Sequence, residues 1–148
     1  MNAMRKVIRL FVAPWYLLGW LSHVYLSLTN PQIYAVFGDT ALIPGYTGLW
    51  KSMVMPSITF FAFLLAGFEI LVGYLLLSEG KWAKTGVVLS ILFNLFLIQM
   101  GLGIPAKSGL QDFLSNRLPN LIFLAIQLPL LWGLDEWLIP KPLRLSRK

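Results

Sequence analysis

The sequence predicts an all-α integral membrane protein, a bundle of four transmembrane helices that forms one membrane domain over residues 1–148. The composition is 57% hydrophobic and 12% charged, with a mean hydropathy of +0.72, which lies outside the range of ordinary soluble domains. Four apolar stretches are each long enough, at about 1.5 Å per residue, to cross a hydrocarbon core of about 30 Å. The net charge of +6 comes from residues beside these stretches, so it indicates membrane orientation and not nucleic-acid binding.

The first helix is expected over about residues 7–28. A basic start followed by an apolar run resembles a signal peptide, but the run is long, contains His23 and several aromatic residues, and lacks a small-residue cleavage site. It is therefore predicted to be retained. Pro14 is expected to bend this helix, and Asn30-Pro31 to end it.

The other three helices are expected over about residues 53–78, 82–104 and 118–137. The connection between the second and third is short and basic, so these two helices should form a hairpin. Pro105 is predicted to end the third helix, and Pro129 to bend the fourth.

Two longer loops, residues 29–52 and 105–117, are predicted on the same side of the membrane. The first loop is too apolar for a free linker, and its aromatic residues suit the membrane interface. We therefore expect it to pack across one mouth of the bundle. A hydrophobic lid is the bolder alternative. The aromatic residues are Tyr34, Phe37, Tyr46 and Trp50.

The basic residues give the orientation, because loops that stay in the cytoplasm are enriched in Lys and Arg. Nine of them fall on the side of both termini and the hairpin, and three fall on the side of the two loops. Both termini are therefore predicted in the cytoplasm, and the membrane is predicted to be the bacterial inner membrane. The nine are Arg5, Lys6, Arg9, Lys81, Lys84, Lys141, Arg144, Arg147 and Lys148, and the three are Lys51, Lys107 and Arg117.

Glu69 is the only carboxylate in the interior of a hydrophobic segment, away from its ends. An ionisable side chain at that depth costs roughly 2.5–3.5 kcal/mol on insertion scales, so it is normally turned inward and either paired or protonated. On helical spacing Glu69 shares a stripe with Ala62, Ala66 and Gly73, and such small residues let a neighbouring helix approach closely. The second helix is therefore predicted to line the inside of the bundle.

Seven polar side chains are the candidate ligand-binding residues. One layer near the membrane midplane should hold Tyr16, Glu69, Asn94 and Gln127. A second layer, nearer the loop side, should hold His23, Gln99 and Asn120. For Asn94 and Gln127 we favour hydrogen bonds between helices over a ligand role. For Glu69 we favour the ligand role over such a hydrogen bond. For His23, ordinary packing is an equal alternative to bonding a ligand. The seven are Tyr16, Glu69, Asn94, Gln127, His23, Gln99 and Asn120.

Glu69 is expected to have no basic side chain beside it. The predicted helix centres place His23 roughly 13 Å away from it along the membrane normal, at 1.5 Å per residue. Desolvation should then keep Glu69 mainly protonated, with Asn94, Gln127 or Tyr16 as its nearest polar group.

Several motifs together resemble the DoxX-like membrane proteins, a family of four-helix chains of about this size. They are E-x-x-x-G at Glu69–Gly73, the following Leu75–Leu77, the short basic hairpin, His23 late in the first helix and Asn120 at the start of the fourth. Val24 stands where the family usually has Gly. The resemblance implies a small subunit of quinone-linked respiratory or sulfur-oxidising complexes, usually without a cofactor of its own.

Three functions compete. The first is a membrane subunit that binds a quinone or lipid head group in a polar intrabundle pocket, with Glu69 and His23 as protonatable partners. The second is a structural accessory subunit of a larger membrane complex, which could carry pigments or haems, or a homo-oligomer. Broad apolar surfaces suit such a partner or lipid, at Leu92, Phe93, Phe96, Leu124 and Leu128.

The third is an enzyme of the sterol-isomerase type. The absence of a second acid at the depth of Glu69 argues against it. No catalytic residue, metal-ligand cluster or phosphate loop is recognised, so catalysis by the chain alone is not expected. The sequence does not identify a cofactor. A quinone is the candidate, haem is not expected, and the lack of cysteine excludes a Cys-ligated iron–sulfur cluster.

Overall fold

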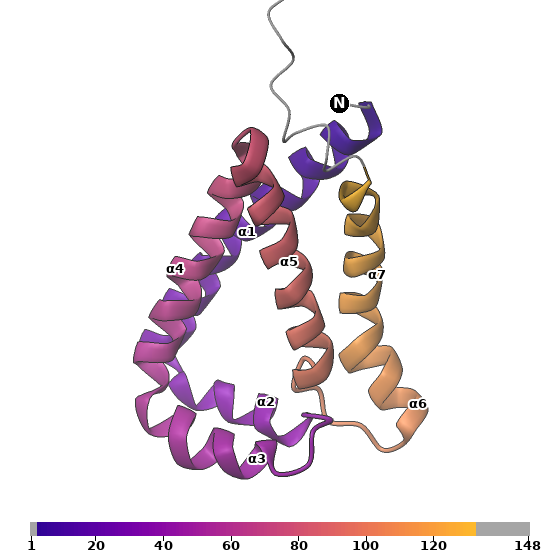
Figure 1. The fold of residues 1–148 in the computed structure, drawn as a ribbon. Coiled ribbons are helices and arrows are strands. Elements are labelled where there is room, and N and C mark those ends of the chain that lie inside the picture. Colours follow the sequence, from indigo (N-terminus) through magenta and orange to yellow (C-terminus); the bar gives the residue numbers. More distant parts are fainter. Residues whose placement is uncertain (1–2, 133–148) are drawn as a thin grey trace, which may run out of the picture.

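The computed structural model describes residues 3–132, and within this range the chain contains helices and connections but no strand (Figure 1). Four rods make up the bundle: α1 (Ala3–Thr29), α4 (Ile58–Leu77), α5 (Gly80–Met100) and α7 (Leu118–Gln127). Three described stretches are long and apolar enough to cross a membrane, namely Ala3–Thr29, Tyr46–Leu77 and Gly80–Met100. The predicted all-helical membrane fold is confirmed to this extent.

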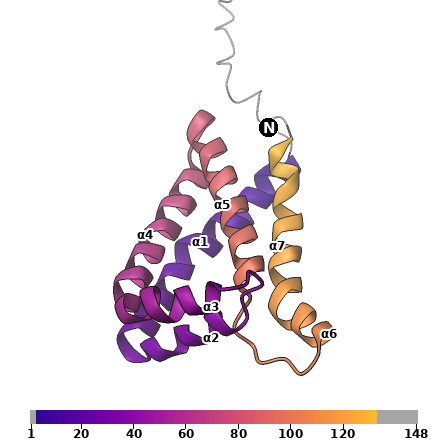
Figure 2. The ribbon, with the colours of Figure 1, turned by 60° about the horizontal axis from the view of Figure 1, so that its bottom comes forward.

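The chain crosses one end of the bundle through short helices, where the sequence predicted an irregular loop (Figure 2). α1 ends at Thr29 as predicted, and residues 30–57, here called the connecting segment, follow it. A bend at Ser57 (φ −122°, ψ 31°) separates this segment from α4, so α4 begins at Ile58 and not at 53. The elements of the connecting segment are η1 (Pro31–Tyr34), α2 (Ala35–Asp39), α3 (Tyr46–Leu49), η2 (Trp50–Val54) and η3 (Met55–Ser57).

α1 and α4 run antiparallel and pack closely because small residues face the contact. A Cβ atom added at Gly73 would lie 2.6 Å from Leu17 Cγ, so only glycine allows this approach. The guanidinium of Arg9 donates to the carbonyls of Leu76 (2.8 and 2.6 Å) and Ser78 (2.6 Å), which caps the end of α4. The predicted stripe of Ala62, Ala66, Glu69 and Gly73 is buried, as expected.

α5 packs on α4 at Gly86, where a Cβ atom would lie 2.8 Å from the backbone nitrogen of Leu76. It ends at Met100, so the prediction that it continues to 104 is wrong. The reason is Gly101, whose φ of +79° leaves the helical region before Pro105 is reached. Asn116 then binds the non-helical backbone, because its Oδ1 accepts from Leu102 N (3.1 Å) and Ile104 N (2.9 Å).

The last rod is an uninterrupted helical run from Gly109 to Leu131. It comprises α6 (Gly109–Asp112), η4 (Phe113–Arg117), α7 and η5 (Leu128–Leu131), so helix replaces part of the loop predicted over 105–117. Pro129 lies in η5, where α-helical geometry gives way to a 3₁₀ turn. Residues 133–137 of the predicted fourth helix and the basic tail lie outside the described residues.

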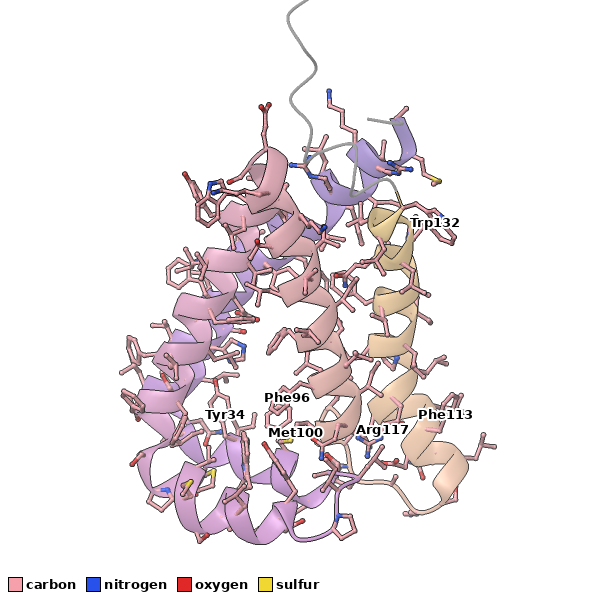
Figure 3. All side chains as sticks on the ribbon, viewed as in Figure 1. Tyr34, Phe96, Met100, Phe113, Arg117 and Trp132 are labelled. Atoms are coloured by element: carbon pink, nitrogen blue, oxygen red, sulfur yellow. The ribbon has the colours of Figure 1, made fainter. Side chains whose placement is uncertain are left out.

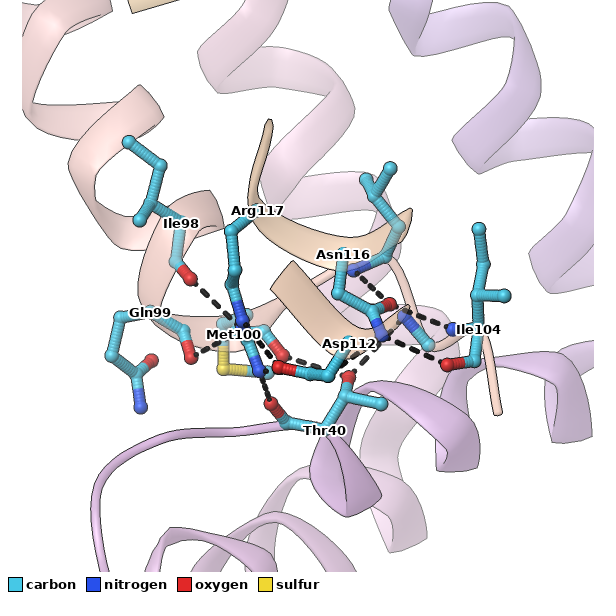
Figure 4. A network of polar contacts seen from close by, with 10 residues as sticks. Thr40, Ile98, Gln99, Met100, Ile104, Asp112, Asn116 and Arg117 are labelled. Carbon is cyan, nitrogen blue, oxygen red and sulfur yellow. Dashed lines mark hydrogen bonds and ion pairs between the residues drawn. The ribbon is translucent and has the colours of Figure 1, made fainter. Parts of the chain in front are cut away.

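Arg117 connects the two predicted loops, residues 29–52 and 105–117, which were expected on the same side of the membrane (Figure 4). Its guanidinium donates to the carbonyl oxygens of Ile98 (2.8 Å) and Gln99 (3.1 Å) near the end of α5 and to that of Thr40 in the connecting segment. It also pairs with Asp112 at 3.3 Å. The two segments therefore meet at one end of the bundle, and the α4–α5 hairpin and the described chain ends lie at the other (Figure 1).

Candidate functional site

A buried hydrogen-bond network joins α1 and α5 at the centre of the bundle. Asn94 Nδ2 donates to Tyr16 Oη (2.9 Å) and to the Ser90 carbonyl (2.8 Å), and Tyr16 Oη donates to the same carbonyl (3.1 Å). Because a carbonyl only accepts, these bonds fix which end of the Asn94 amide is nitrogen. The structure thus brings together Tyr16 and Asn94, two of the predicted residues of the midplane layer.

Glu69 reaches the same region from α4, opposite a glycine of α1. A Cβ atom at Gly19 would lie 3.0 Å from Glu69 Oε2 and 3.1 Å from Oε1, so the carboxylate occupies the space that a larger residue would fill. Glu69 is 7% exposed. The sequence analysis assigned no role to Gly19, so its role in making room for the Glu69 carboxylate was missed.

His23 is the direct partner of Glu69, with Nε2 at 3.4 Å from Oε1. The prediction that roughly 13 Å separates them, and that Asn94, Gln127 or Tyr16 is the nearest polar group, is therefore wrong. The prediction aligned the centres of the two helices, whereas the helices pack with Gly19 opposite Glu69. His23 is one helical turn after Gly19, on the same face of α1, so its ring reaches the same carboxylate.

Tyr34 extends this pair into the connecting segment, where Figure 3 places it on the inner side of the bundle. Its Oη lies 3.0 Å from His23 Nδ1, and Tyr34 is 4% exposed. Trp50 Nε1 donates to the Tyr34 carbonyl (2.8 Å), which holds η1 in place. Burial and then the charge of Glu69 raise the pKa of the Tyr34 phenol, so it stays neutral and can donate or accept. Sequence reasoning assigned Tyr34 only to the membrane interface.

Glu69 and His23 can hold one proton between them. A proton between Nε2 and Oε1 satisfies both atoms, whether the pair is written as imidazolium and carboxylate or as imidazole and carboxylic acid. A buried carboxylate with such a partner avoids the large cost of an isolated charge in a low-dielectric interior. The three side chains therefore form a chain of polar contacts from Glu69 through His23 to Tyr34, and Glu69 is placed to bind a polar group.

A cavity of about 350 Å³ lies between α1, α4, α5 and α7. Four of the seven predicted residues line it: Tyr16, Glu69, Asn94 and Asn120. The rest of the wall is apolar and rich in aromatic rings, which suits a small ligand with a few polar groups. The apolar lining consists of Trp15, Phe93, Leu97, Leu102, Pro119, Ile122, Phe123 and Ile126.

Three residues of the cavity wall each carry a buried side-chain atom without a hydrogen-bond partner among the described residues. These atoms are Glu69 Oε2, Asn94 Oδ1 and Asn120 Nδ2. All three residues are at least nine-tenths buried, with exposures of 7%, 1% and 8%. Buried polar groups without a partner are rare, because each costs about 1–3 kcal/mol, so their gathering on one cavity indicates a place for a polar ligand.

The other predicted residues lie off the cavity wall. Gln127 Nε2 donates to the Phe123 carbonyl of its own helix (3.2 Å), and its Oε1 is buried without a partner. The backbone carbonyl of Gln99 accepts from Leu42 N (3.0 Å), while its side-chain Nε2 is also buried without a partner. Phe93, predicted to face lipid, instead lines the cavity, with its ring centroid 6.1 Å from that of Tyr16.

No cluster of three or more His, Asp or Glu side chains that could hold a metal ion occurs within residues 3–132. No protein-family model, curated protein or solved structure matches the chain. Support for a function therefore comes from the arrangement of the cavity and of the Glu69–His23–Tyr34 contacts.

Proposed function

We propose that this chain is a four-helix protein of the bacterial inner membrane whose intrabundle cavity binds the head group of a quinone or lipid. The observation that carries the proposal is the set of three unpartnered polar atoms, on Glu69, Asn94 and Asn120, at one largely apolar cavity. A head group that forms hydrogen bonds there would relieve the cost of leaving these atoms unpaired. Aromatic side chains around it suit a flat ring.

A fourth membrane crossing is part of this proposal. The uninterrupted helical run from Gly109 to Leu131 supports it, because that run returns the chain to the end where α1 begins (Figure 1). The distribution of basic residues supports cytoplasmic termini, since Lys81 and Lys84 lie at the hairpin end while Lys51 and Lys107 lie at the other.

We also propose that the chain is a DoxX-like subunit of a quinone-linked membrane complex. The motif positions Glu69 and Gly73 both contact α1, through Gly19 and Leu17, so they are placed to shape the site. Large apolar side chains on the outside of the bundle, among them Phe60, Leu64 and Leu92, suit contact with lipid or with a partner helix.

A purely structural accessory role is the second candidate. The Tyr16–Asn94–Ser90 network supports it, because such hydrogen bonds between helices recur in membrane bundles without any ligand. An isomerase-type activity has less support, since Glu69 is the only carboxylate among the residues that line the cavity.

Binding to the full-length protein tests the proposal. The protein would be placed in lipid nanodiscs and titrated with a short-tailed benzoquinone by calorimetry, with empty nanodiscs to subtract partition into lipid. Asn120→Leu removes a polar group from the cavity wall and adds bulk, so it should weaken binding at least about tenfold. Gln127→Leu removes an equally buried amide off the cavity and should bind like the wild type.

Extraction from the native membrane supplies the second measurement. The protein purified in mild detergent should carry a quinone or a specific lipid that mass spectrometry identifies, and Asn120→Leu should lose it. A wild-type protein that neither retains nor binds such a molecule, yet migrates with a larger complex on native gels, would replace the proposal by the accessory role.

A further inference from the structure

The unpartnered polar atoms on the residues of the cavity wall are mainly hydrogen-bond acceptors. Asn94 offers Oδ1, because its nitrogen is held by Tyr16 Oη and the Ser90 carbonyl. That carbonyl cannot donate, so the amide cannot turn without losing a bond. A ligand group opposite Asn94 Oδ1 therefore has to donate a hydrogen bond.

Glu69 offers a second acceptor. Its Oε1 is 3.4 Å from His23 Nε2, and its Oε2 is buried without a hydrogen-bond partner among the described residues. As the ionised partner of His23, Glu69 can only accept a hydrogen bond at Oε2. Asn120 Nδ2 is the one unpartnered donor on the wall.

The apolar part of the wall indicates the shape of the head group. Trp15, Tyr16, Phe93 and Phe123 line the cavity, and the ring centroids of Trp15 and Phe123 are 5.3 Å apart. A cavity of about 350 Å³ is more than twice the size that admits benzene, which enters an engineered void of about 150 Å³. A single substituted ring therefore fits.

We propose that the cavity selects an aromatic diol of the hydroquinone class over the corresponding quinone, an inference that rests on the proposed function. One hydroxyl can donate to Glu69 Oε2 and one to Asn94 Oδ1, while a hydroxyl oxygen accepts from Asn120 Nδ2. A quinone carries only carbonyl acceptors. It can pair with Asn120 alone, and it leaves two buried acceptors facing its own lone pairs.

The test compares two ligands that differ by two hydrogen atoms. Full-length protein in nanodiscs would be titrated under anaerobic conditions with a short-tailed benzoquinone and with its hydroquinone, each corrected for partition into empty nanodiscs. The hydroquinone is expected to bind at least about tenfold more tightly, since two more buried acceptors are satisfied. Equal affinities, or tighter binding of the quinone, would overturn the inference and leave the proposed function standing.

Two variants identify the groups that create the preference. Asn94→Leu removes one acceptor, so the ratio of the two affinities should fall towards one, whereas Asn120→Leu removes the donor and should weaken the quinone at least as much as the hydroquinone. Gln127→Leu removes a buried acceptor off the cavity and should keep the wild-type ratio. An unchanged ratio in a folded Asn94→Leu protein would also refute the inference, and binding of neither ligand by the wild type would refute it together with the quinone part of the proposed function.

Discussion

His23 Nε2 lies 3.4 Å from Glu69 Oε1, across the contact between α1 and α4. This pair places the only histidine of the chain beside the only acid within the described helices α1, α4, α5 and α7. The second carboxylate oxygen, Oε2, is buried without a hydrogen-bond partner among the described residues, and Glu69 is part of the cavity wall. The same acid thus takes part in holding two helices together and in forming the candidate site.

The pair should be energetically coupled. His23→Leu leaves the buried Glu69 carboxyl without its partner and should lower the free energy of unfolding by about 1–3 kcal/mol. Glu69→Leu leaves the partly exposed His23 in contact with Tyr34 and should lower it by less. The double variant should lose about 1 kcal/mol less unfolding free energy than the sum of the two single losses, because neither polar group is then left without its partner. Unfolding in mixed micelles with increasing SDS measures all four proteins.

Ser22→Ala serves as the control for this cycle. The Ser22 hydroxyl is exposed and donates to the Gly19 carbonyl of its own helix (2.7 Å). The stability lost in Ser22→Ala should therefore simply add to the stability lost in Glu69→Leu. Strict additivity between His23→Leu and Glu69→Leu would show that the contact contributes nothing to stability.

Gly19 should be required for the placement of Glu69. In Gly19→Ala the new methyl group meets both carboxylate oxygens at about their contact limit, so the acid must shift, and a cost of about 1–3 kcal/mol is expected. Gly67→Ala is the matched control, since nothing lies within 4 Å of a Cβ atom there. It should stabilise α4 by about 0.5–1 kcal/mol, and an equal loss of stability in both variants would contradict the assigned role of Gly19.

Short-range patterns predicted the local features of the fold. Small residues at helical spacing identified the inner face of α4, and Asn30-Pro31 identified the end of α1. The start of α4 could not be read in the same way, because the chain is helical on both sides of the bend at Ser57. His23 was placed too far from Glu69 because the helix centres were aligned, whereas Gly19 lies opposite Glu69.

Contacts made by the connecting segment had no signal in the sequence. Tyr34 reaches His23 because η1 folds back along the last turns of α1, which depends on tertiary packing and on the bond from Trp50 Nε1. The early end of α5 was also not predicted, because it too depends on a contact with another part of the chain. Gly101 ends the helix because Asn116, distant in sequence, satisfies the backbone beyond it.

Arg117 should hold the α2–α3 end of the bundle together. Arg117→Met removes the donors to three carbonyl oxygens and the partner of Asp112, so the free energy of unfolding should fall by about 2 kcal/mol or more. Residues 40–46 should also become more susceptible to protease, because Thr40 loses its contact with α5. Lys107→Met, at an exposed position nearby, should change stability by no more than about 0.5 kcal/mol, and matching effects of the two variants would refute the role given to Arg117.

The proposed four-crossing topology predicts which positions face each side of the membrane. The chain contains no cysteine, so single cysteines can be introduced without a background. Gly48 and Ala106 are exposed at the α2–α3 end, and Glu79 is exposed at the hairpin. Gly48 is preferable to Gly45, whose φ of +81° would strain a cysteine.

Labelling with a membrane-impermeant maleimide in intact spheroplasts distinguishes the orientations. Gly48→Cys and Ala106→Cys should react from outside, whereas Glu79→Cys should react only after the membrane is opened, because the basic hairpin is predicted to stay in the cytoplasm. Reaction of Glu79→Cys in intact cells would reverse the proposed orientation. If Gly48→Cys and Ala106→Cys reacted from opposite sides, the shared end formed by Thr40 and Arg117 would be contradicted, and with it the four-helix arrangement around the cavity.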